Sequence, residues 1–223
     1  MVWIQEHCPT LIGLCLALGG PILLAIGDRF SSDSKSLISS LLQQLLLAGL
    51  GLLILGIVLF WETQPLSSIG LQPLRWQAMV WGVAFAGILI FIYSPLLLWA
   101  MQRLNLTGFE GGLSKLTLLP IWYLVLAVMV GGTTEEILYR GYATERLSEF
   151  TGSYWSGSIL ALIAFGLAHV PMWGWTPALT TVISGSLLTL FYLWTGDLLS
   201  CIIAHIVTDS VGIIMPALQR RNL

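Results

Sequence analysis

Six ionisable side chains lie in the apolar C-terminal part of the sequence, where a charge is costly unless it is used or paired. They are Glu135, Glu136, Arg140, His169, His205 and Asp209. Carboxylates and imidazoles are the groups with which proteins take up and release protons. Ionisable residues inside membrane-type segments mark functional sites by default. We therefore treat these six as candidate catalytic residues.

Pairs of side chains in this region lie four residues apart, which on a helix places both members on one face, about 5–6 Å apart. Three of them are Glu136 with Arg140, Phe165 with His169, and His205 with Asp209, and Glu135 with Tyr139 repeats the spacing one step round the helix. Each pair alone has a structural explanation, such as an ion pair at a helix end or a hydrogen-bonded core histidine. Their joint occurrence within residues 135–209 favours a functional explanation.

The two glutamates follow the segment 131–134 (GGTT), which permits two local structures. Thr133 and Glu136 have the spacing of a capping box, so a helix could begin here with its carboxylates near the positive end of the helix dipole. A continuous helix containing a pair of glycines is the alternative. The sequence leaves both open.

The composition places these residues in a membrane protein. Hydrophobic residues make up 57% of the 223 residues and charged residues 9%, with a mean hydropathy of +0.88. A soluble domain is about a quarter charged, so a water-soluble enzyme, a disordered region and a disulfide scaffold are excluded. The net charge of −2 offers no basic surface for nucleic acid. The three cysteines have no metal or redox spacing.

The gaps between charged residues predict an all-α fold, a polytopic transmembrane helix bundle of about seven spans. A crossing needs about 20 apolar residues, and seven fit: 9–27, 37–61, 77–101, 117–134 or its extension through 148, 154–170, 177–195 and 198–217. We expect one membrane domain with two parts. Residues 1–115 form scaffold helices and an interfacial linker, and residues 116–223 form the motif-bearing bundle.

Three short segments carry the six residues: 135–141 (EEILYRG), 165–169 (FGLAH) and 205–209 (HIVTD). In order, spacing and hydrophobic context they resemble the E-E-x-x-x-R-G, F-x-x-x-H and H-x-x-x-N/D motifs of the CAAX protease and bacteriocin-processing family, also called the Abi family. The stretch 185–198, which ends WTGDL, is similar to the glycine-containing helix and turn that usually precede the third motif.

The resemblance implies an intramembrane endopeptidase of the type II CAAX prenyl protease kind. Carried over to this sequence, it implies that Glu135 and His169 activate a water, and that Glu136 and Arg140 support and orient them. His205 and the residue at 209 stabilise the oxyanion. The chemistry agrees, because Arg140 would keep Glu136 ionised and so allow two adjacent carboxylates to hold different protonation states.

The third motif usually ends in Asn, whereas this sequence has Asp209. An ionised Asp cannot donate a hydrogen bond to an oxyanion. Asp209 is therefore protonated, or pairs with His205 and keeps it as a donating imidazolium, or binds a cation. The family is named as metalloproteases, which implies zinc or another divalent cation held by His169, His205 and Glu135. A metal-free glutamate mechanism is the alternative.

The implied partners are the lipid bilayer and a membrane-embedded or lipidated peptide, such as a prenylated CAAX peptide or a leader peptide. We expect a multi-pass protein of the bacterial plasma membrane or an equivalent internal membrane. The competing hypothesis is a catalytically silent family member that acts as an immunity or membrane-complex assembly factor. Ion transport is a weaker hypothesis, since the first three spans have no charged residue in their interiors.

Overall fold

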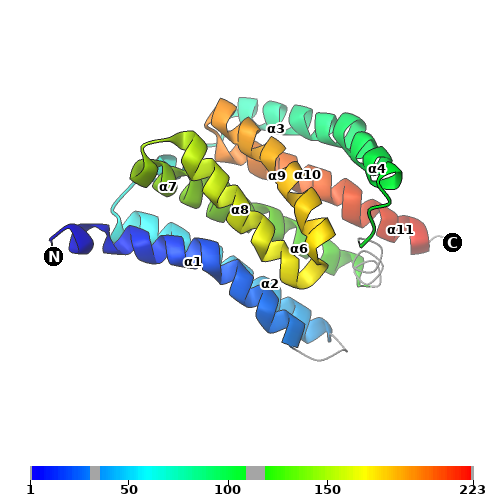
Figure 1. The fold of residues 1–223 in the computed structure, drawn as a ribbon, viewed down its shortest axis with the longest axis horizontal. Helices are drawn as coiled ribbons and strands as arrows, with labels where there is room; N and C mark the ends of the chain where they lie inside the picture. The colour runs from blue at the N-terminus through cyan, green and yellow to red at the C-terminus, as the bar shows by residue number, and fades with distance from the viewer. Residues whose placement is uncertain (1, 31–35, 109–118, 222–223) are drawn as a thin grey trace.

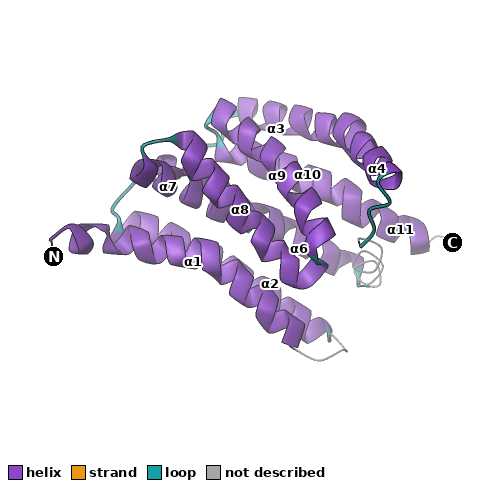
Figure 2. Ribbon diagram, viewed as in Figure 1, coloured by secondary structure: helices purple, strands orange, loops and turns teal. Residues whose placement is uncertain are grey.

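The computed structural model describes residues 2–30, 36–108 and 119–221, and this part of the chain is helical without a strand (Figure 2). Seven of its helices are long and apolar enough to cross a membrane. They span His7–Gly27, Leu37–Trp61, Trp76–Arg103, Ile121–Thr151, Tyr154–Trp173, Trp175–Thr195 and Leu198–Arg221. The predicted all-α bundle of seven spans is confirmed. The predicted boundary between residues 115 and 116 lies outside the described residues.

The helices pack as two outer groups on either side of a central one (Figure 1). On one side lie α1 (Val2–Phe30) and α2 (Leu37–Gly56), which contact each other. On the other side lie α3 (Trp76–Ile88) and α4 (Ser94–Arg103), joined through the π-helical turn η3 (Leu89–Tyr93). Large apolar side chains such as Phe60 and Ile92 are exposed on the outer surface, where the bilayer would surround the bundle.

The remaining helices fill the space between these groups. α8 (Tyr154–Trp173) packs on α1 and on α9 (Trp175–Thr195), and α10 (Leu198–Asp209) packs on α3 and α6. The last span continues through the π-helical turn η5 (Ser210–Ile214) into α11 (Met215–Arg221).

The fourth span is the centre of the bundle. It consists of α6 (Ile121–Glu135), the π-helical segment η4 (Glu136–Ala143) and α7 (Thr144–Thr151) in one continuous helix. The longer of the two predicted versions of this span is therefore correct, and no helix begins at Thr133. All eight residues of η4 are buried, because α1, α2, α8 and α10 all contact this segment.

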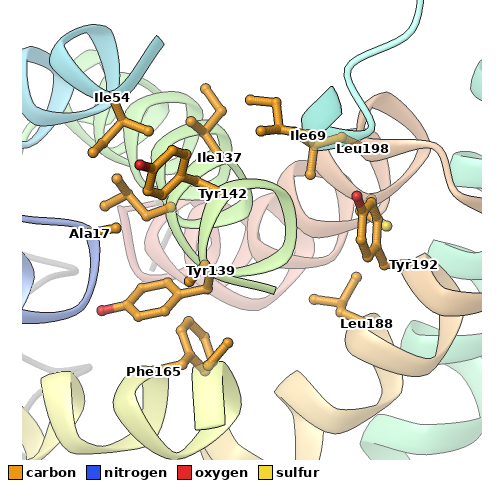
Figure 3. Close-up of a cluster of buried hydrophobic side chains, with 14 of the residues drawn as sticks. Ala17, Ile54, Ile69, Ile137, Tyr139, Tyr142, Phe165, Leu188, Tyr192 and Leu198 are labelled. Atoms are coloured by element: carbon orange, nitrogen blue, oxygen red, sulfur yellow. The ribbon is translucent and has the colours of Figure 1, made fainter. Parts of the chain in front are cut away.

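The main hydrophobic core surrounds η4. Figure 3 shows side chains from several elements meeting there, with Tyr139 and Tyr142 of η4 between Ala17 of α1 on one side and Leu198 of α10 on the other. π-Helical turns are rare and frequently occur at functional sites. In this protein η4 begins directly after Glu135 and contains Glu136 and Arg140. Another such segment, η5, begins directly after Asp209.

Two of the short turns between spans follow one local rule. Gly152 directly after α7 and Gly196 directly after α9 are both in the left-handed conformation, with φ of 70° and 61°. The next residue in each case begins a new helix by capping it, Ser153 for α8 and Asp197 for α10. Two residues are enough to reverse the chain, so α7 lies against α8 and α9 against α10.

A buried ionic cluster fixes the linker between the second and third spans. After the π-helical turn η1 (Ile57–Trp61), Glu62 Oε2 accepts hydrogen bonds from Arg146 Nε at 2.9 Å and Nη2 at 2.7 Å. Tyr142 donates to the other oxygen of Glu62 at 2.6 Å. The linker then forms the 3-10 turn η2 (Leu66–Ile69), after which Gly70 O accepts from Leu198 N at 2.9 Å.

Replacing Glu62 should destabilise the fold far more than replacing the other acidic partner of Arg146. Glu62 and Arg146 side chains are only 5% and 3% exposed, whereas Glu149, 3.0 Å from Arg146 Nη1, is 63% exposed. We expect Glu62→Gln to lower the free energy of unfolding by about 3 kcal/mol, and the matched Glu149→Gln by less than about 1 kcal/mol. Titration with SDS in mixed micelles measures both. Equal losses would contradict a structural role for the Glu62 pair.

Candidate active site

Glu136 is the centre of the candidate site. Its side chain is fully buried, and its Oε1 accepts hydrogen bonds from Arg140 Nη1 at 2.9 Å and from His205 Nδ1 at 2.7 Å. The first partner lies one turn away on η4, and the second comes from α10, 69 residues later. The other oxygen, Oε2, is buried without a partner among the described residues. One carboxylate oxygen therefore joins two of the three sequence motifs.

Arg140 extends this network to α8 and α9. Its Nη2 donates to the backbone oxygen of Gly185 at 3.1 Å, and its guanidinium carbon lies 4.3 Å from the ring centre of Phe165. A planar guanidinium can bond a carboxylate and a carbonyl at once while its face covers an aromatic ring. Arg140 thus holds η4, α8 and α9 in fixed relation around the buried carboxylate.

His205 connects the buried network to the two less buried acids. Its Nε2 is 3.5 Å from Asp209 Oδ2 and 3.9 Å from Glu135 Oε2. An imidazole has a hydrogen to donate on each nitrogen only when it is protonated, and a carboxylate lies beside each nitrogen of His205. Of the three alternatives for Asp209, this position beside His205 matches the pairing one.

His169 is held by its own helix. Its Nδ1 lies 2.8 Å from Phe165 O, and its ring packs edge-on against the Phe165 ring with centres 4.7 Å apart. A carbonyl oxygen only accepts hydrogen bonds, so Nδ1 carries the hydrogen, and in the neutral ring Nε2 has the free lone pair. The second motif therefore places its phenylalanine between Arg140 and the histidine and sets the tautomer of that histidine.

A cavity of ≈ 120 Å³ joins the first and second motifs. Glu135, Tyr139 and His169 line it together with apolar residues of α1 and α2, among them Pro21 and Leu47. His205 and Asp209 do not line it. The Tyr139 side chain is 1% exposed, and its hydroxyl has no hydrogen-bond partner among the described residues. Figure 3 shows that hydroxyl pointing away from the aromatic core, on the side of α1.

This arrangement places one of the three predicted metal ligands outside the cavity that the other two share. His169 and Glu135 share the cavity, whereas His205 lies behind Glu135 with both ring nitrogens facing carboxylates. Within residues 7–27, 36–108 and 119–221, no three His, Cys, Asp or Glu side chains are grouped closely enough to hold a metal ion. The arrangement gives no support to the ligand set, and metal binding stays a prediction.

Three parts of the site were not assigned a role from the sequence. Tyr139 follows Glu135 by four residues, and this spacing was a signal that its hydroxyl would lie on the same face. The Gly185 carbonyl had no signal, because any residue type offers a backbone oxygen. Apart from Gln43, the residues of α1 and α2 that line the cavity are apolar, as lipid-facing residues also are, so the sequence could not assign them to the site.

Gly185 has to be glycine for Arg140 to reach its carbonyl. A Cβ at this position would lie 2.8 Å from Phe165 Cε1 and 2.9 Å from Arg140 Nη2. We expect Gly185→Ala to cost about 1–3 kcal/mol by overpacking. Gly131→Ala is the matched control, since a Cβ there meets nothing within 4 Å and alanine favours a helix by up to about 1 kcal/mol. Thermal unfolding in detergent compares them, and a Gly185→Ala protein as stable as wild type would refute the packing argument.

Comparison with known families agrees with the motifs. Residues 117–211 match the family model described as Type II CAAX prenyl endopeptidase Rce1-like. The comparisons with curated proteins and with solved structures gave no match. The matched segment contains all six candidate residues and the central helix that carries three of them. The resemblance seen in the sequence is confirmed over these residues: residues 117–211 of this integral membrane protein are similar to the Rce1-like type II CAAX prenyl endopeptidases.

Proposed function

We propose that the protein hydrolyses a peptide bond of a membrane-associated peptide, with a water activated by Glu135 and His169. The observation that carries the proposal is the shared cavity, in which a carboxylate from α6 and an imidazole from α8 face the same ≈ 120 Å³. That volume accommodates a few waters. A peptide group can enter beside them only if it comes as a narrow, extended segment.

The proposed reaction uses Glu135 as the base. The carboxylate takes a proton from the water as the water oxygen attacks the carbonyl carbon of the substrate. The free lone pair on His169 Nε2 accepts the second hydrogen of this water and orients it. When the C–N bond breaks, the proton held by Glu135 passes to the leaving amine, and the carboxylate is restored.

The negative charge that develops on the substrate oxygen needs a donor in the cavity. Tyr139 is the candidate, because this residue lines the cavity and its buried hydroxyl has no other partner among the described residues. We propose Tyr139 as an oxyanion donor. The oxyanion role implied for His205 and Asp209 stays a prediction, as does metal dependence, and no step above relies on either.

Glu136, Arg140 and His205 act in this scheme as positioning residues. His205 limits where the Glu135 carboxylate can lie, because its Nε2 is 3.9 Å from Glu135 Oε2 while Nδ1 is fixed by Glu136. The apolar wall formed by Pro21, Leu24 and Leu47 suits a substrate with apolar side chains or a lipid group. A prenylated CAAX peptide and a hydrophobic leader peptide are therefore the substrate classes that we propose.

Glu135→Gln should abolish cleavage while the protein still folds. Glutamine keeps the size of the side chain but cannot accept a proton, so we expect a loss of at least about 10²-fold, the usual contribution of a general base. The measurement compares protein termini in membranes that contain wild type or variant at equal abundance. Termini present only with wild type identify the substrate.

The control for charge alone is Glu149→Gln, which removes an exposed carboxylate of α7 outside the cavity and should cleave like wild type. If the termini are identical with wild type and Glu135→Gln, and the variant still supports the function of the cell, the protein is an assembly or immunity factor and the proposed hydrolysis is wrong.

Tyr139→Phe separates the oxyanion donor from a structural role. Removal of one such donor costs about 10²–10³ in kcat, with KM nearly unchanged. Stability should stay equal or rise, because a buried hydroxyl without a partner is lost. The identified substrate, as a synthetic peptide, gives kcat and KM for the purified enzyme. Unchanged kcat would remove Tyr139 from the mechanism and leave Glu135 and His169 in it.

A further inference from the structure

A second cavity lies at the C-terminal end of the fourth span. It is surrounded by aromatic residues of the kind found at the level of lipid headgroups. Several large aromatic side chains at the ends of spans are strongly exposed: Trp61, Trp76, Tyr154, Trp155 and Trp194. All five belong to the same end of the bundle, because the second, fourth and sixth spans end there and the third, fifth and seventh begin there. Exposed Trp and Tyr gather at membrane–water interfaces, so this end lies among lipid headgroups.

The cavity at this end has a volume of ≈ 380 Å³ and combines one carboxylate with aromatic rings. Its lining is formed by Glu145 of α7, Tyr154 and Trp155 of α8, and Tyr192, Leu193 and Gly196 at the end of α9. The exposed fractions of Tyr154 and Trp155 are 57% and 63%, so the cavity is accessible from outside, whereas Tyr192 at 2% is buried.

Glu145 has hydrogen bonds but no ion pair among the described residues. Tyr192 donates to its Oε1 at 2.7 Å and Tyr154 to its Oε2 at 3.1 Å. Its neighbour Arg146 is engaged with Glu62 and Glu149 instead. Each oxygen of a carboxylate can accept a second hydrogen bond. The two tyrosines therefore hold the carboxylate in place and leave both its charge and part of its acceptor capacity for a ligand.

An anionic group surrounded by aromatic rings is the chemistry that recognises organic cations. The faces of Trp and Tyr attract ammonium groups within about 6 Å, and cages of this kind bind choline and methylated amines. From the position among headgroups and this lining, we propose that the cavity binds the ammonium group of a phospholipid headgroup, ethanolamine or choline, and so seats one lipid against α7, α8 and α9.

The test measures which lipid stays bound to the purified protein. Wild type is reconstituted in nanodiscs with equal amounts of phosphatidylethanolamine and phosphatidylglycerol, and the lipids retained are counted by native mass spectrometry. A second set of nanodiscs contains phosphatidylcholine in place of phosphatidylethanolamine. We expect wild type to retain the ammonium lipid over phosphatidylglycerol by about threefold or more, and Glu145→Gln to lose this preference. The readout involves no cleavage, so it is independent of the proposed hydrolysis.

Glu149→Gln is the matched control, because it removes the same charge one turn along α7 from a residue outside the cavity lining. It should retain the ammonium lipid like wild type. If Glu145→Gln fails to fold, Trp155→Leu takes its place, since it removes an exposed ring without touching the Glu145 hydrogen bonds. Loss of the preference in Trp155→Leu then supports the site.

Wild type without a preference for either ammonium lipid would overturn the proposal, as would an equal loss in Glu145→Gln and Glu149→Gln. A separate experiment tests whether the ligand is a lipid or a free amine. In it, soluble glycerophosphoethanolamine replaces the lipid at the same concentration. We expect no retained adduct of the soluble compound. Retention equal to that of the lipid would mean that the cavity binds free amines instead.

Discussion

The Oε1 atom of Glu136 is the point on which the arrangement of the site depends. A carboxylate in a membrane bundle has no water to stabilise it, so its charge has to be matched by fixed donors. Arg140 provides one from the same helix and His205 another from α10. Since Arg140 also bonds the Gly185 carbonyl and covers Phe165, four helical elements meet around one atom. The positions of Glu135 and His169 follow from this network.

Much of the fold could be predicted from the sequence, because lipid imposes a simple rule: about 20 apolar residues per crossing. The seven spans follow from the gaps between charges. The extension of the fourth span through Arg140 and Arg146 could not be decided in advance, because both side chains are charged and such residues also mark the end of a span. The structure resolves this by burying each arginine against a glutamate, Glu136 in one case and Glu62 in the other. The partner of Arg146 lies 84 residues away, which local spacing cannot reveal.

For the site, spacing identified residues that share a helix but not residues that share a cavity. The motifs predicted the Glu136–Arg140 bond, and the structure places Asp209 beside His205 as one predicted alternative required. Spacing could not show that Glu135 faces His169's cavity while Glu136, its neighbour, turns to His205. That division depends on how three helices are rotated against one another. The apolar residues of α1 and α2 that line the cavity could not be predicted either, because the sequence does not distinguish a leucine that lines a cavity from one that faces lipid.

The π-helical segment η4 has a consequence for how this sequence can change. On its cavity side the central helix presents Glu135, and eleven residues later it presents Arg146 to Glu62. A helix advances about 100° per residue, so the wider turns of η4 set the angle between these two directions. A deletion or insertion of one residue between them would rotate one end against the other and separate either the Glu135 carboxylate or the arginine from its partners. Substitutions within this stretch should therefore be tolerated better than insertions or deletions. We expect alignments of related chains to contain no gap between the two positions.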